Sequence, residues 1–182
     1  MKAYRVSLWF PLVALLLAAT HLTIEYVSGG VQSHHLLNDA TLPAISNWFE
    51  LVTLPLLGLA LAKYAQLQPA HIVRLATVPV SLLPGLIGAV CYGAVFAASF
   101  ALGQMTLTTV LFFGLLPCAV LFPLYRLHYI SGFTVAMTFT FGGILPLVIA
   151  AALVLVSWCS RFIIARVVTG WRKYRASPAQ PL

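Results

Sequence analysis

Long apolar runs, separated by short polar or basic segments, form the dominant pattern of the chain. A helix that crosses about 30 Å of hydrocarbon needs about 20 consecutive, mostly apolar residues. The first two runs of this kind cover residues 6–26 and 45–62. The next uncharged stretch, residues 75–125, is long enough for two more helices, and the polar sequence at 102–106 predicts the turn between them. The pattern therefore predicts four membrane-spanning helices before residue 126.

The number of spans depends on residues 127–160, a stretch of 34 residues without a charge. It is too long for one straight span and short for two. Lys and Arg concentrate on the cytoplasmic side of membrane proteins, so their positions help to decide. Five spans would place Lys2, Arg5, Lys63, Arg74 and Arg126 on one side and Arg161, Arg166, Arg172, Lys173 and Arg175 on the other. Six spans place all ten basic residues on one side and favour a single orientation.

Gly142 and Gly143 mark the turn that a sixth span requires, because glycine tolerates the backbone angles of tight turns. We therefore expect an all-α, polytopic transmembrane bundle of six spans, the last two at residues 124–141 and 144–162, with both termini in the cytoplasm. Five spans with one long final helix is the alternative. Residues 1–168 are expected to form a single transmembrane helical domain, and residues 169–182 a basic interfacial tail with a disordered end.

Composition agrees with a membrane location. Of the 182 residues, 62% are hydrophobic and only 7% are charged, whereas a soluble domain carries about a quarter charged residues. The formal net charge is +7, but the basic residues lie at the edges of apolar runs, so nucleic-acid binding is the weaker interpretation. We expect an integral protein of a bacterial inner (plasma) membrane. Its basic C-terminal residues Arg161, Arg166, Arg172, Lys173 and Arg175 would contact anionic lipids at the cytoplasmic face.

The beginning of the sequence resembles a signal peptide but does not fit one. Lys2 and Arg5 precede an apolar run, as in a signal peptide, but this run continues to Val27 and is longer than the usual apolar core of such a peptide. We expect it to be retained as the first span.

Cys91, Cys118 and Cys159 lie far apart inside apolar stretches. They are expected to be buried apolar side chains and not a redox pair.

A polar cluster interrupts the apolar pattern between residues 21 and 50. His21 and Glu25 are four residues apart near the end of the first predicted helix, and Asn47 and Glu50 are three apart at the start of the second. Each spacing places two side chains on one helix face. The loop between these helices adds His34, His35, Asn38 and Asp39. All three carboxylates and three of the five histidines should therefore meet at the non-cytoplasmic end of the first helical hairpin.

The chemistry of this cluster predicts catalysis or ion binding. A carboxylate at membrane depth costs several kcal/mol unless it is paired, protonated or bound to a metal. Imidazole and carboxylate together bind Zn, Fe or Cu, and they also form proton relays. The predicted roles are catalytic for Glu25 and Glu50, metal ligation for His21, His34, His35 and Asp39, and polar support for Asn38, Ser46 and Asn47.

Each of these residues also has a simpler structural interpretation. His34 and His35 fit a solvated loop, and Asp39 fits the chemistry of a turn. Ser46 or Asn47 fits the cap of the second helix, and Trp48 an aromatic anchor at the membrane surface. His71 and His128 are expected to be residues of the cytoplasmic interface.

Four classes of function remain open. The leading hypothesis is a metal-dependent membrane enzyme of the hydrolase type, in which bound metal activates water and Glu25 or Glu50 acts as the general base. The alternative is a proton- or cation-coupled transporter or an accessory subunit of a membrane complex, which the Leu-Pro pairs inside four apolar runs favour. A haem protein ranks last because two histidines deep within facing spans would be needed, and only His21 is expected at such depth, whereas His128 is expected at the cytoplasmic interface. A scaffold without chemistry is the plain alternative, and both a homo-oligomer and a larger complex stay open.

Overall fold

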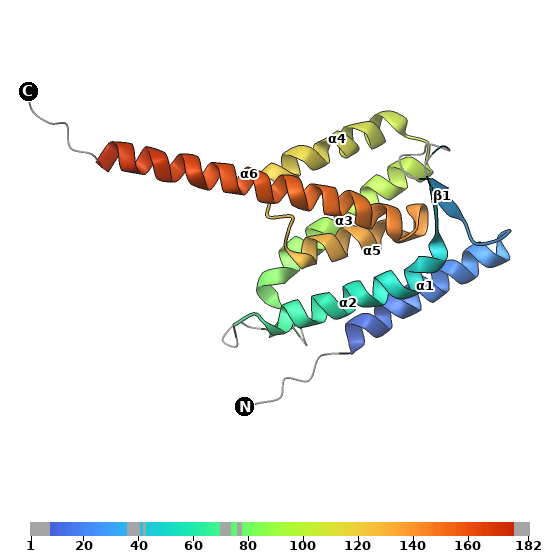
Figure 1. Cartoon of the computed structure of the whole chain (residues 1–182). Coiled ribbons are helices and arrows are strands. Elements are labelled where there is room, and N and C mark those ends of the chain that lie inside the picture. The colour runs from blue at the N-terminus through green and yellow to red at the C-terminus, as the bar shows by residue number, and fades with distance from the viewer. Residues whose placement is uncertain (1–7, 36–40, 42, 70–73, 76–77, 177–182) are drawn as a thin grey trace, which may run out of the picture.

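The computed structural model is an all-helical protein, and it describes residues 8–35, 41, 43–69, 74–75 and 78–176 (Figure 1). Six α-helices account for most of these residues. They are α1 (Trp9–Val27), α2 (Glu50–Gln66), α3 (Leu83–Ala101), α4 (Met105–Leu121), α5 (Leu127–Phe141) and α6 (Ile144–Ala176). Residues 127–160 thus contribute to two helices, and the predicted turn at Gly142 and Gly143 is confirmed. The alternative of one long final helix over this stretch is wrong.

Successive helices run in alternate directions, so that α1 begins and α6 ends on the same side of the molecule, at the left of Figure 1. The main helix pairs are α1 with α2 and α3 with α5. Both pairs approach closely at a glycine. A Cβ atom on Gly58 would lie 2.7 Å from the carbonyl oxygen of Phe10, and one on Gly132 would lie 2.7 Å from that of Leu86. Small residues of this kind let helices in membranes pack backbone against backbone.

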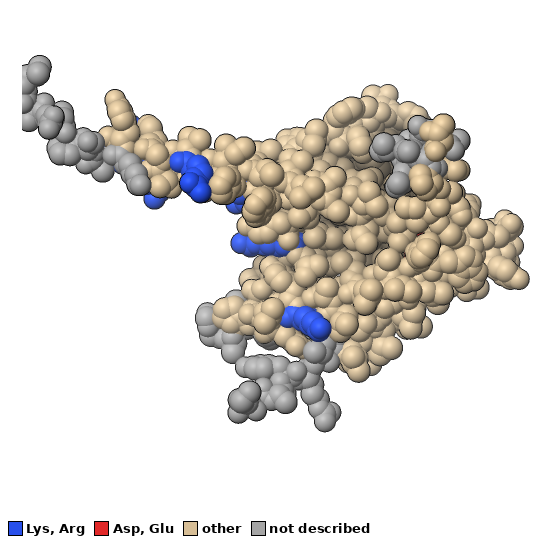
Figure 2. Space-filling view, viewed as in Figure 1, with Lys and Arg blue, Asp and Glu red and all other residues tan. Residues whose placement is uncertain are grey.

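The surface of the bundle is predominantly apolar. Four helical stretches are long and apolar enough to cross a membrane: Trp9–Val27, Asn47–Gln66, Val80–Ala101 and Ile144–Arg172. The helix α4 is also apolar but has only 17 residues, and α5 has 15. On the face shown in Figure 2 the surface is almost entirely uncharged, and the Lys and Arg side chains that are visible lie toward the side where α6 projects. These features indicate a membrane protein.

The segment between α1 and α2 differs from the predicted loop. Strand β1 (Ser33–His35) pairs with strand β2 (Ala44–Ser46) in an antiparallel ribbon, in which His34 lies opposite Ile45. The second helix was predicted to start at Ile45, and this is wrong because Ser46 has an extended backbone. Its hydroxyl oxygen accepts a hydrogen bond of 3.4 Å from the backbone N–H of Trp48. Ser46 therefore caps the short 3-10 helix Asn47–Phe49, which leads into α2.

The connection between α2 and α3 contains a second, shorter ribbon. Strand β3 (Arg74–Leu75) pairs with strand β4 (Val78–Pro79), and the 3-10 helix Val80–Leu82 follows. This ribbon and the basic residue Lys63 near the end of α2 lie at the opposite end of α2 from Glu50. His71 lies outside the described residues.

The prolines of the four Leu-Pro pairs lie at two kinds of position in the helices. Pro55 and Pro117 lie inside α2 and α4, but Pro84 and Pro146 lie in the first turns of α3 and α6. Backbone N–H groups in a first turn have no intrahelical partner, so a proline there does not break the helix.

Cys91 and Cys159 are exposed on the outside of the bundle, and Cys118 is half-buried. The expectation of three buried thiols is wrong because α3 and α6 turn these two residues outward.

Helix α6 is longer than the predicted sixth span. It runs without a break through Phe162 and past residue 168, and its C-terminal part projects beyond the other helices (Figure 1). Arg161 donates a 3.1 Å hydrogen bond from Nη2 to the carbonyl oxygen of Leu121 in the last turn of α4, where helix carbonyls lack partners. Further along, the guanidinium of Arg166 lies 4.8 Å from the ring of Phe162, and that of Arg175 lies 3.8 Å from the ring of Trp171.

Candidate functional site

Three parts of the chain meet at the end of the bundle that carries the β1–β2 ribbon. The last turns of α1 contribute His21 and Glu25. The 3-10 helix before α2 contributes Asn47, the first residue of α2 is Glu50, and the turn between α5 and α6 contributes Gly143. We call these five residues the acid cluster. Glu50 is completely buried, His21 and Asn47 are 4% and 2% exposed, and the side chain of Glu25 is 10% exposed. The predicted convergence of α1 and α2 side chains is therefore observed for these residues.

The imidazole of His21 lies between the two carboxylates. Its Nδ1 atom is 3.0 Å from Oε2 of Glu50, and its Nε2 atom is 3.6 Å from Oε1 of Glu25. Its ring also packs edge-on against Phe139 of α5, with ring centroids 5.4 Å apart. The two nitrogens of an imidazole point in different directions, so Nδ1 faces Glu50 and Nε2 faces Glu25. Within the described residues, these contacts are the ion pairs of the acid cluster.

The second oxygen of Glu50 is held by the turn between the last two helices. The backbone N–H of Gly143 donates to Oε1 of Glu50 at 2.6 Å. Gly143 directly precedes α6, and Glu50 is itself the first residue of α2. The positive ends of two helix dipoles thus face this carboxylate and offset part of the cost of burying a negative charge there. Sequence reasoning found both the glycine turn and the buried acid, but it gave no sign that they touch.

Glu25 has a separate set of donors. The side-chain amide of Asn47 donates from Nδ2 to Oε1 of Glu25 at 2.6 Å, and the backbone N–H of Gln32 donates to Oε2 at 3.2 Å. The side chain of Asn47 therefore forms a hydrogen bond with Glu25 and does not cap α2. The result is a continuous chain of polar contacts from Gln32 near the surface through Glu25 and His21 to the enclosed Glu50.

The other predicted site residues that the structure describes lie outside this cluster. His34 is half-buried and His35 exposed on strand β1, where adjacent side chains point to opposite faces. Asn38 and Asp39 lie outside the described residues. Within the part of the chain that the structure describes, no group of three His, Cys, Asp or Glu side chains is placed to hold a metal ion. The metal ligation predicted for His21, His34, His35 and Asp39 stays a prediction.

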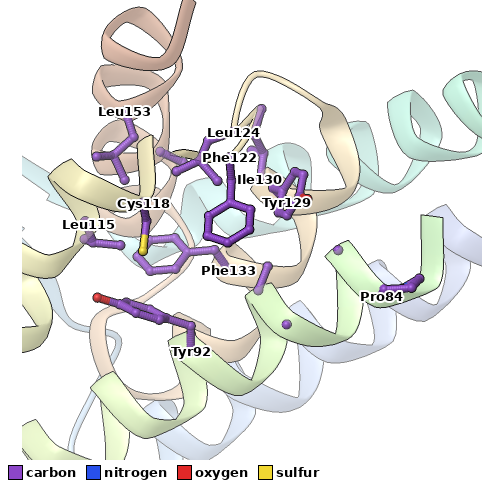
Figure 3. Close-up of a pocket in the computed structure, with 14 residues that line it drawn as sticks. Pro84, Tyr92, Leu115, Cys118, Phe122, Leu124, Tyr129, Ile130, Phe133 and Leu153 are labelled. Atoms are coloured by element: carbon purple, nitrogen blue, oxygen red, sulfur yellow. The ribbon is translucent and has the colours of Figure 1, made fainter. Parts of the chain in front are cut away.

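A cavity of about 360 Å³ lies elsewhere, between α3, α4, α5 and α6 (Figure 3). Its wall is formed by apolar and aromatic side chains, including Leu115, Phe133 and Leu153. Tyr92 also lines it, but its hydroxyl donates a 2.6 Å hydrogen bond to the carbonyl oxygen of Leu111. The cavity contains no acid, so it is distinct from the acid cluster.

Comparison of the chain with protein-family models, with curated proteins and with solved structures found no match. The geometry of the acid cluster therefore carries the functional argument alone.

Proposed function

We propose that this protein is a proton-coupled membrane transporter, or the proton-binding subunit of a membrane complex, in which the acid cluster takes up and releases the proton. The observation that carries this proposal is the buried imidazole of His21, which stands between two carboxylates at 3.0 and 3.6 Å.

The number of protons in this group can change with only a small movement of side chains. Nδ1 of His21 already lies within hydrogen-bond distance of Glu50, and Nε2 lies 3.6 Å from Glu25, just beyond that distance. A neutral imidazole has one N–H and can donate to only one carboxylate, whereas an imidazolium donates to both. A proton that arrives at Glu25, the more exposed acid, can pass to Nε2 of His21. The imidazole can then release the proton on Nδ1 to Oε2 of Glu50. Histidine is suited to this relay because its charge changes within the physiological pH range.

The proposed setting is a six-span bundle in a bacterial inner membrane, with both termini in the cytoplasm. In this arrangement the acid cluster faces the extracytoplasmic side, and the basic residues of α6 approach anionic lipid at the other face. The alternate directions of the six helices support this topology. The subunit alternative includes a homo-oligomer and a larger complex, and no role for nucleic acid is proposed.

Proton flux into liposomes tests this proposal. Purified protein is reconstituted with an enclosed pH-sensitive dye, and an inward proton gradient is imposed with a potassium diffusion potential to balance the charge. We expect rapid acidification with the wild type and at least about a hundredfold slower uptake with Glu50→Gln, in line with the loss of a proton-transfer group. Gln keeps the shape of the side chain and can still accept from Gly143, so the fold should be retained.

A matched control comes from the other histidines of the N-terminal half. His34→Gln changes an imidazole outside the acid cluster and should leave the flux unchanged. Equal flux with the wild type and Glu50→Gln would refute the proton-coupled function, as would the absence of flux in the wild type under any imposed gradient.

The metal-dependent hydrolase is a second proposal, and the short distance in sequence between His34, His35 and Asp39 supports it. Its geometric support is weaker than that of the relay, because both nitrogens of His21 already face carboxylates and Glu50 has no exposed surface. Elemental analysis of the purified protein provides the test. One equivalent of Zn, Fe or Cu in the wild type, lost in the double variant His34→Ala/His35→Ala, would support the enzyme, and metal-free wild type would refute it.

A further inference from the structure

Helix α5 carries a line of buried polar side chains that lies outside the acid cluster. His128, Ser131, Thr134 and Thr138 are spaced by three, three and four residues, which places them along one side of the helix. Their exposed fractions are between 0% and 4%. Ser131, Thr134 and Thr138 lie inside the predicted apolar span at residues 124–141, and no role was predicted for them.

Three polar atoms in this line have no hydrogen-bond partner among the residues that the structure describes. They are Nδ1 of His128, Oγ of Ser131 and Oγ1 of Thr134. The hydroxyl of Thr138, by contrast, donates a 2.9 Å bond to the carbonyl oxygen of Thr134. A buried polar atom that remains unpaired costs about 1 to 3 kcal/mol, so such atoms in proteins are nearly always bonded. Water is the ordinary partner of a buried group that finds none in the protein.

The two ends of this line lie at two distinct places in the bundle. At one end α5 reaches the acid cluster, because the ring of Phe139 contacts His21 and a Cβ atom on Gly142 would lie 2.9 Å from Oε1 of Glu50. At the other end is His128, ten residues before Thr138, which corresponds to about 15 Å of helix. The line therefore covers much of the depth of the bundle.

His128 is enclosed at its end of the line. Its ring lies 6.1 Å from the ring of Tyr64 on α2 and 4.4 Å from that of Tyr129. Gly85 of α3 lies against it, since a Cβ atom there would be 2.6 Å from Nε2. The titratable groups around it are the phenols of Tyr64 and Tyr129 and the guanidinium of Arg126, the residue that precedes α5. The unpaired Nδ1 of this imidazole can form a hydrogen bond with a water molecule.

We propose that the polar face of α5 holds a file of water molecules that conducts protons between the acid cluster and His128, which is a second proton-binding site. This inference rests on the proposed proton-coupled function and adds the route that the proton takes. Hydroxyl groups and water both accept and donate hydrogen bonds. The first transfer breaks the O–H bond of the Glu50 carboxyl and leaves a carboxylate, and each following transfer breaks one O–H bond of the file as the next is formed. The last transfer forms an N–H bond at Nδ1 of His128, and no electrons are exchanged.

The double variant Ser131→Ala/Thr134→Val tests the route. It removes two hydroxyl groups and keeps the side-chain volumes close to those of the wild type. In the liposome assay we expect proton flux to fall about tenfold, equivalent to about one hydrogen bond lost from the path. The matched control is Thr53→Val on α2, whose hydroxyl donates 3.0 Å to the carbonyl oxygen of Phe49 and lies outside the line. It should transport as the wild type does.

Hydroxyl-radical labelling by X-ray radiolysis gives a second readout that does not require transport. A buried side chain is labelled quickly only where water is bound beside it. We expect His128, which is 3% exposed, to be labelled in the wild type and in Thr53→Val, and more slowly in the double variant. Thermal unfolding of each protein shows whether the fold is retained.

The outcomes separate the two proposals. Wild-type flux that Glu50→Gln abolishes but the double variant leaves unchanged would overturn the water file and keep the proton-coupled function. An unlabelled His128 in the wild type would also overturn the file. A wild type that conducts no protons would overturn the proposed function and, with it, the proton route along α5.

Discussion

Replacement of Gly142 by alanine is expected to destabilise the protein by about 3 kcal/mol or more and to disrupt the acid cluster. Gly142 ends α5 with φ +71° and ψ 171°, a conformation that residues with a side chain rarely adopt, and such strain costs about 1 to 3 kcal/mol. In addition, the new methyl group would overlap the side-chain oxygen of Asn47. Relief of this overlap would move Asn47 away from Glu25 and Gly143 away from Glu50.

Gly103 provides the matched control for this substitution. It also has a left-handed backbone, with φ +70°, but a Cβ atom there would meet nothing within 4 Å. Gly103→Ala should therefore show the backbone strain alone, about 1 kcal/mol. Thermal unfolding in detergent measures both variants. A loss of stability no larger at Gly142 than at Gly103 would contradict the tight contact between the α5–α6 turn and the acid cluster.

Replacement of His21 by phenylalanine is expected to cost about 3 kcal/mol at neutral pH. The ring and its contact with Phe139 are retained, but both nitrogens are lost. Glu50 and Glu25 then face one another without a donor between them, and removal of one partner from a buried charged group typically costs this much. The free energy of unfolding of the variant, measured by denaturant titration, checks the value.

A double variant distinguishes the electrostatic effect from a packing effect. Glu50→Gln removes one of the two carboxylates, so it should partly restore the stability lost in His21→Phe. We expect the double variant to lose about 1 to 3 kcal/mol less than the sum of the two single changes, as is usual for residues in direct contact. Strictly additive losses would show that His21 does not couple electrically to Glu50.

Much of the helical architecture could be predicted from apolar runs, basic residues and the glycine pair, because these report directly on burial and turns. The position of β2 could not be predicted in this way, since Ile45 fits an apolar helix and a short strand equally well. The sequence also predicted that the C-terminal tail extends the last helix beyond the sixth span, and α6 does continue to Ala176. The Arg residues beyond Phe162 end the apolar run, but they do not disfavour a helix.

The candidate site was predictable only where its residues are close in sequence. The spacing of His21 with Glu25 and of Asn47 with Glu50 placed each pair on one helix face, and the structure brings these two faces together. The contact with Gly143 could not be predicted, because periodicity shows which face of a helix is polar but not which distant turn covers it. The hydroxyl groups of α5 were missed for the same reason.

The hydrogen bond between Glu50 and Gly143 joins residues 93 positions apart, whereas His21 precedes Glu50 by only 29. The ribosome therefore synthesises the first helical hairpin, which contains Glu50, long before it synthesises the α5–α6 turn that contains Gly143. We expect His21 to hold the Glu50 carboxyl through this interval. Folding of the new chain would be complete when α5 and α6 insert and the backbone N–H of Gly143 donates its hydrogen bond to Glu50.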